Sequence, residues 1–154
     1  YAAARDPQPD VRASAATALA AVETDDAKAL EVLVPFAAAG QSGKVRRAAA
    51  HALAKYGPAA SAAVPGLITM LEKETERGES MRALKAIGVK NVPDLVSMLA
   101  VRDVRVRTFA CESLGSLGPD AKEAAPKLRE IASQDAAIRG PATSALKKID
   151  PTAP

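Results

Sequence analysis

The 154-residue chain has few of the residues that usually build reactive or aromatic sites. It contains no Trp, two Phe, two Tyr, one His and one Cys. One Cys cannot form an internal disulfide, and one His with one Cys cannot supply the four ligands of a structural zinc site. No apolar run approaches the roughly 20 residues that a membrane span needs, and no segment resembles a signal peptide. We therefore expect a soluble chain without a cofactor, and favour the cytoplasm because a lone Cys suits a reducing compartment.

Charge of one sign is also lacking, because 21 basic residues are nearly balanced by 18 acidic ones. The resulting net charge of +3 does not by itself indicate a polyanion as partner. A composition of 48% hydrophobic and 25% charged residues is typical of a folded chain. With so little aromatic bulk, the core must come from the close approach of helices. Because the sequence begins at Tyr1 rather than Met, we expect it to be a piece of a longer protein.

One sequence pattern recurs five times. Relative positions 1, 5, 8, 9 and 12 are small or apolar, except for Glu76 at the first position of the third copy, and these positions form one face of an α-helix. The copies begin at Val11, Val45, Glu76, Val106 and Ile138. In the first copy the last apolar position, position 12, is Val22. The second position is always arginine, at intervals of 30 to 34 residues: Arg12, Arg46, Arg77, Arg107 and Arg139. Such a period predicts stacked structural repeats.

A shorter apolar pattern follows each of the first four copies and predicts a second helix. Pro65, Pro93 and Pro126 stand near the starts of three of these helices, where a missing N–H is tolerated. In the first repeat Pro35 lies about two turns inside the pattern, which predicts a kink or a late helix start. Residues 74–80 are predicted to be the loosest joint, because Glu76 replaces an apolar residue and Gly78 weakens the helix start.

Helix ends are also marked in the sequence. Ser42, Asp103 and Asp135 stand three residues before the apolar face of their copies, where they can accept hydrogen bonds from the first turn. Gly57 and Gly118, each followed by proline, are typical of helix ends.

Helix pairs with V-R-x-x-A-x-x-A-L in the first helix and V-P-x-L or A-P-x-L in the second resemble HEAT repeats, and are most similar to the bacterial phycobilisome-lyase HEAT-like type. The resemblance implies an all-α, right-handed superhelix of about four and a half helix pairs, with the second helices lining a concave face. We predict a single domain over residues 1–154, with repeats at 6–40, 41–74, 75–101, 102–133 and 134–150.

The resemblance also implies an interaction scaffold without catalytic activity, whose partner is another protein of unknown identity. On a regular superhelix the concave face would present exposed positions of the second helices: Lys28, Glu31, Thr69, Met70, Lys73, Asp94, Ser97, Lys127 and Glu130. These charges alternate in sign, which suits a polar partner surface.

Two alternative functions stay open. The arginine column, with Lys44, Arg47, Arg102 and Arg105 near it, could form a basic ridge that binds nucleic acid or another anion. We favour a structural role for that column, in which the arginines bind acids and backbone carbonyls at the turns between repeats. The other alternative is an accessory or lyase domain of a larger enzyme, whose catalytic residues would lie elsewhere.

Few residues qualify as catalytic, and we predict that the chain is not an enzyme. His51 lies in a column of polar residues that we expect to face solvent, and Cys111 lies in a packing column without a His to activate it. The chain has no phosphate-binding glycine motif, and it lacks the repeated His-Glu pairs of the iron hydroxylases built on similar repeats. We predict no catalytic, cofactor or metal residue.

Overall fold

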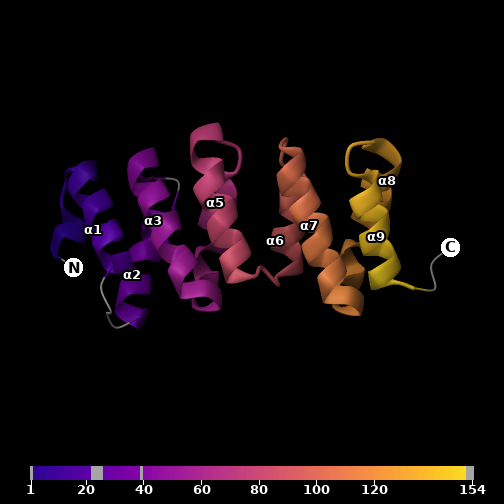
Figure 1. The fold of residues 1–154 in the computed structure, drawn as a ribbon, viewed down its shortest axis with the longest axis horizontal. Coiled ribbons are helices and arrows are strands. Elements are labelled where there is room, and N and C mark those ends of the chain that lie inside the picture. Colours follow the sequence, from indigo (N-terminus) through magenta and orange to yellow (C-terminus); the bar gives the residue numbers. More distant parts are fainter. Residues whose placement is uncertain (1, 22–25, 39, 152–154) are drawn as a thin grey trace. The chain divides into compact units, whose positions relative to one another are not determined.

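The computed structural model describes residues 2–21, 26–38 and 40–151, and the described residues form helices and turns without a β-strand. The predicted all-α fold of packed helix pairs is therefore confirmed (Figure 1). Contacts divide the chain into an N-terminal unit, Tyr1–Val89, and a C-terminal unit, Lys90–Pro154. The prediction of a single domain over residues 1–154 stays a prediction.

The N-terminal unit has two layers of helices. The first helices of successive repeats pack side by side, α1 against α3 and α3 against α5, while α2 packs on α3 and α4 packs on α5 (Figure 1). Their bounds are η1 Ala2–Arg5, α1 Pro9–Ala21, α2 Asp26–Phe36, α3 Gly43–Tyr56, η2 Gly57–Ala63, α4 Val64–Met70 and α5 Glu74–Ile87, where η denotes a 3-10 helix.

The C-terminal unit repeats this arrangement. Helix α7 packs beside α9, while α6 packs on α7 and α8 packs on α9. The bounds are α6 Val92–Met98, α7 Val104–Leu117, η3 Gly118–Ala124, α8 Ala125–Gln134 and α9 Arg139–Ile149.

The apolar face predicted for each first helix forms the core. In the second repeat Val45, Ala49, Ala52 and Leu53 are all fully buried. Alanine at two of these positions lets neighbouring helices approach closely, so the core is dense without aromatic rings. Val22 lies outside the described residues.

The predicted helix ends are largely confirmed. Gly57 and Gly118 have positive φ angles of 51° and 57°, a backbone conformation that favours glycine, and each begins a 3-10 helix that leads into α4 or α8. Ser42 accepts a hydrogen bond from the first turn of α3, as Asp103 does from that of α7. The prediction for Asp135 is wrong, because α9 begins only at Arg139 and Asp135 accepts from the N–H of Ala137 in the preceding turn.

Two further predictions about the helices are wrong. Helix α2 begins at Asp26 and contains Pro35 as its penultimate residue, so the proline marks the end of the helix rather than a late start. Residues 74–80 are not a loose joint, because they form the first turns of α5. Glu76 and Ser80 are buried there, and the Ser80 hydroxyl donates to the Leu67 carbonyl at 2.5 Å.

Candidate protein-binding surfaces

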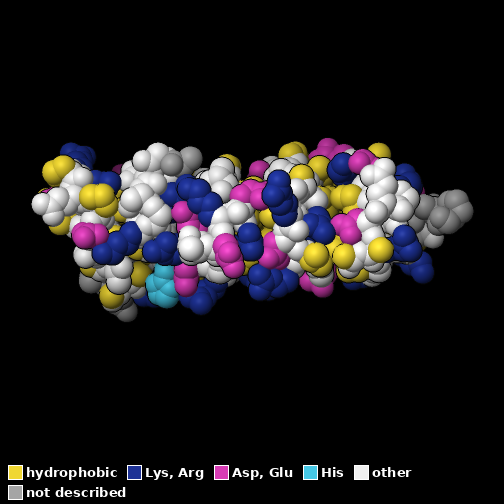
Figure 2. All heavy atoms as spheres, turned by 90° about the horizontal axis from the view of Figure 1, so that it is seen from above, with side chains coloured by type: hydrophobic (Ala, Val, Ile, Leu, Met, Phe, Trp, Pro, Cys, Tyr) yellow, Lys and Arg dark blue, Asp and Glu magenta, His cyan; other side chains and the backbone are white. Residues whose placement is uncertain are grey.

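The second helices of the N-terminal unit expose four of the predicted partner-binding residues. Lys28 and Glu31 lie on α2, Thr69 lies on α4, and Lys73 lies in the turn that leads to α5. All four are exposed, and they present both signs of charge. Figure 2 shows the same mixing on one face of the molecule, where Lys and Arg side chains lie among Asp and Glu side chains.

Met70 does not belong to this set. Its side chain is 0% exposed. Leu67 and Met70 lie three residues apart on the seven-residue helix α4, and Leu71 follows at its end. All three side chains are buried in the protein core. Residues three or four apart share a helix face, so the spacing from Leu67 was the signal that Met70 faces inward.

The second helices of the C-terminal unit carry the remaining predicted residues. On α6, Asp94 is half-buried and Ser97 is exposed, and the Ser97 hydroxyl donates to the Asp94 carbonyl at 2.7 Å. On α8, the Lys127 ammonium lies 2.9 Å from both carboxylate oxygens of Glu130. This exposed pair is a fixed dipole on the helix surface, which a partner of matching polarity can recognise.

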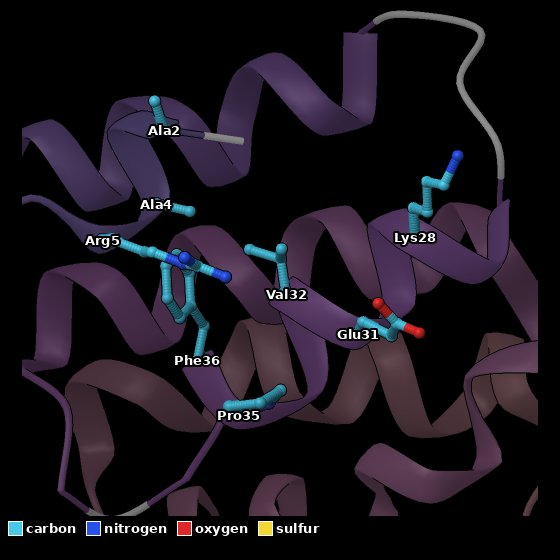
Figure 3. Close-up of a pocket in the computed structure, with 8 residues that line it drawn as sticks. All are labelled: Ala2, Ala4, Arg5, Lys28, Glu31, Val32, Pro35 and Phe36. Atoms are coloured by element: carbon cyan, nitrogen blue, oxygen red, sulfur yellow. The ribbon is translucent and has the colours of Figure 1, made fainter.

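A groove in the N-terminal unit runs between η1 and α2 (Figure 3). Its volume is about 580 Å³. The lining combines apolar and charged side chains: Ala2, Ala4, Arg5, Lys28, Glu31, Val32, Pro35 and Phe36. Two of these, Lys28 and Glu31, were predicted from the sequence, whereas Arg5 and the apolar residues of α2 were missed. The available signal was Phe36, one of only two Phe residues in the chain.

Four of the five column arginines bind backbone carbonyls in the segment that precedes their own helix. Arg12 Nη1 donates to the carbonyls of Asp6 and Pro7 at 2.7 and 2.8 Å, and Arg77 Nε donates to that of Leu71 at 2.6 Å. Arg107 and Arg139 make equivalent bonds to Val101 and Ala132. Arg77, Arg107 and Arg139 therefore tie their first helices to the end of the preceding repeat, and Arg12 ties α1 to the residues just before it, as the structural interpretation predicts.

Arg46 differs from the other four. Its guanidinium is buried between α3 and α5, where it forms an ion pair with Glu76. Glu76 is also 3.7 Å from the ammonium of Lys73, so the carboxylate lies between two cations. Neither member of the buried pair is accessible to an anionic ligand.

Three exposed or half-buried cations of the predicted basic ridge are paired with carboxylates inside their own unit. Lys44 lies 2.7 Å from Asp10, Arg105 lies 2.9 Å from Asp103, and Arg107 lies 3.0 Å from Asp135. The hydrogen bonds that Arg105 donates to the Asp103 carboxylate, reinforced by the charge of that carboxylate, raise the pKa of Arg105. These carboxylates compete with any incoming phosphate and reduce the positive potential at the ridge.

His51 and Cys111 lie in the environments that the sequence predicts. The His51 side chain is 60% exposed, and its Nδ1 lies 3.5 Å from the carboxylate of Glu79. Cys111 is fully buried, and burial, followed by the charges of Glu112 and Asp135, raises the pKa of its thiol to about 11. A thiol with that pKa is almost entirely protonated near neutral pH, which disfavours nucleophilic chemistry.

Within residues 2–21, 26–38 and 40–151, no three His, Cys, Asp or Glu side chains gather as a metal site would require. Across the same residues, none of the helices has the length and apolar character needed to cross a membrane. The chain matches the sequence family described as HEAT repeats, over residues 1–88 and 64–147. No curated protein matches it.

Proposed function

The chain belongs to the HEAT repeat family, and we propose that it is a non-catalytic scaffold that binds another protein through the exposed residues of its second helices. The observation that carries this proposal is the groove beside α2, because it joins two exposed charged residues, Lys28 and Glu31, to an apolar depression. Polar side chains around apolar surface are the usual composition of a protein-binding site. In the first helices, by contrast, the apolar faces are buried in the core, and the column arginines Arg12 and Arg107 bind backbone carbonyls.

Site-specific photo-crosslinking tests which helices contact a partner. A benzophenone amino acid is introduced at Thr69 or Ser97, which are exposed at the second helices, and at Thr17 or Ser144, which are exposed on first helices. In cells of the source organism, we expect one discrete crosslinked polypeptide from the second-helix positions and none from the matched first-helix positions. The same crosslinks from Thr17 and Ser144, or none from Thr69 and Ser97, would contradict the proposal.

Once that polypeptide is identified, the Lys127–Glu130 pair separates binding from stability. Lys127→Glu places two like charges three residues apart on α8, which costs a few tenths of a kcal/mol. The swap Lys127→Glu with Glu130→Lys restores an ion pair but reverses its polarity. Both variants should weaken binding of the captured partner, and only the single variant should lower the melting temperature. Unchanged binding of the swap would remove α8 from the proposed surface.

A further inference from the structure

The groove between η1 and α2 has an apolar floor. Phe36 is 5% exposed, Val32 is half-buried, and Pro35 is exposed in the last turn of α2. These residues lie at the same part of α2, close to Ala4 of η1 (Figure 3). A volume of about 580 Å³ lies within the range of pockets that hold small ligands or a few side chains. The floor can therefore accommodate one apolar side chain.

Charged side chains border this floor. Arg5 extends from η1 toward the end of α2 that carries Phe36, whereas Glu31 and Lys28 lie further toward the start of α2 (Figure 3). The rise of an α-helix places Glu31 roughly 7.5 Å along the axis from Phe36, so Glu31 lies well away from the Arg5 end. In the described part of the chain, Arg5 has no carboxylate within ion-pair distance. Arg5 is therefore a cation of the lining that an acidic ligand can pair with.

Arg5 differs from the column arginines, each of which has a partner inside the fold. Arg12, Arg77, Arg107 and Arg139 are all held by backbone carbonyls, and Arg46 is held by Glu76. A guanidinium without a carboxylate partner, next to an apolar surface, is suited to bind a carboxylate through two parallel hydrogen bonds. Hydrophobic contact next to that pair would exclude water and strengthen it.

We propose that this groove binds a short segment of the partner protein in which an acidic side chain stands next to an apolar one. The carboxylate pairs with Arg5, and the apolar side chain fills the depression formed by Val32, Pro35 and Phe36. This inference rests on the proposed scaffold function and names the chemistry of the segment that one part of the surface recognises. It also predicts weak binding by an isolated peptide, since the rest of the partner surface is then missing.

Nuclear magnetic resonance titration of the ¹⁵N-labelled chain tests the proposal with defined probes. The first probe is a blocked Gly-Ser-Asp-Leu-Gly-Ser peptide, and the controls replace its Asp by Lys or its Leu by Ser. We expect the Asp-Leu peptide to shift the amide signals of residues 31–34 and 36 in a saturable way, since Pro35 has no N–H. Each control peptide should bind about tenfold more weakly, the change expected on losing one charge-assisted contact or one buried aliphatic side chain.

Variants of Arg5 then test the charge assignment. Arg5→Gln should weaken the binding of the Asp-Leu peptide by about the same factor as the control peptides do. Arg5→Glu should reverse the preference, so that the Lys-Leu peptide binds more tightly than the Asp-Leu peptide. Lys90→Glu makes the same charge change at an exposed residue of the other unit and should leave the affinity unchanged. Circular dichroism establishes that each variant is folded, which is expected because Arg5 is exposed.

Two results would overturn the proposal. The first is binding of all three peptides with equal affinity. The second is that acetate shifts the same amide signals at the same concentrations as the Asp-Leu peptide, which would make the groove a site for small carboxylates. Failure of the peptide titration while the crosslinks from Thr69 persist would reject this inference and leave the scaffold function standing. Peptide binding without any crosslink from Thr69 or Ser97 would support the groove and reject the scaffold function.

Discussion

The buried ion pair between Arg46 and Glu76 leads to a prediction that runs against the repeat pattern. Glu76 occupies a position that is Val or Ile in the other four copies. By sequence alone, Glu76→Val restores the usual residue and should be harmless. In the structure, however, the Arg46 and Glu76 side chains are only 2% and 4% exposed. We therefore expect Glu76→Val to destabilise the N-terminal unit strongly.

The magnitude follows from the charge that the substitution leaves behind. Without the Glu76 carboxylate, the Arg46 guanidinium stays between α3 and α5 with neither water nor its anion. Breaking a buried pair by removing one member typically costs about 3–5 kcal/mol in the free energy of unfolding. Replacing both members by apolar residues of similar size is often neutral or stabilising. The double variant Arg46→Met with Glu76→Val should therefore recover the stability of the original chain.

Urea unfolding followed by far-ultraviolet circular dichroism measures these differences, with the free energy extrapolated linearly to zero denaturant. Glu79→Val is the matched control, because it makes the same change on the same helix at a pair that is partly exposed. Glu79 lies 2.9 Å from Arg82, and its side chain is 30% exposed. Exposed pairs contribute about 0–1 kcal/mol, so this control should lose far less stability than Glu76→Val.

Two results would refute this reasoning. Equal unfolding midpoints for Glu76→Val and Glu79→Val would show that the buried charge carries no special cost. A double variant no more stable than Glu76→Val would show that the loss comes from packing around residue 76 rather than from an unpaired Arg46.

Three further predictions concern other parts of the molecule. A Cβ on Gly115 would lie 3.0 Å from the Cα of Ala145, so Gly115→Ala should force α7 and α9 apart and lower the free energy of unfolding by about 1–3 kcal/mol in urea titrations. Gly140→Ala, whose Cβ would meet nothing within 4 Å, is its control and should not destabilise. Burial raises the pKa of Cys111 to about 11 in the folded chain, so the folded state favours the protonated thiol. The contribution of this thiol to the free energy of unfolding is therefore complete below the pKa of the unfolded thiol. It is lost as the pH rises toward 11. Melting curves should show this loss in the original chain and not in Cys111→Ala. Titration with duplex and single-stranded DNA should give negligible binding, because Lys44, Arg105 and Arg107 are paired with carboxylates and other ridge arginines bind backbone carbonyls. Tight binding that weakens steeply with salt would instead support the basic ridge.

Most of the helical architecture could be predicted from local sequence. The apolar columns of the first helices depend on a 3.6-residue period that each copy contains within itself, so they could be found without knowing the neighbouring helices. The glycines that end α3 and α7 are equally local signals, because positive φ angles strongly favour glycine. Burial of Leu53 and Leu114 followed directly from this pattern.

Errors arose where a residue's role depends on another repeat. Residues 74–80 looked weak because Glu76 and Gly78 oppose a helix start when considered alone, yet packing against α3 buries Glu76 and fixes the segment. Met70 was misplaced because α4 is only seven residues long, which leaves few turns from which to read the buried face. The groove was missed because Arg5 and Phe36 come from segments about thirty residues apart, and no local period relates them.

The arginine column shows most clearly how position in the sequence and role in the structure can separate. Arg12 and Arg77 reach back to the carbonyls before their own helices, which any copy of the repeat can provide. Arg46 is buried because the next first helix offers a carboxylate at its first apolar position. Arg107 does both, binding the Val101 carbonyl and, through its other nitrogen, Asp135 of the following repeat. The partners of Arg46 and Arg107 thus depend on the acid that the following repeat places beside them, and a repeat taken alone does not contain that information.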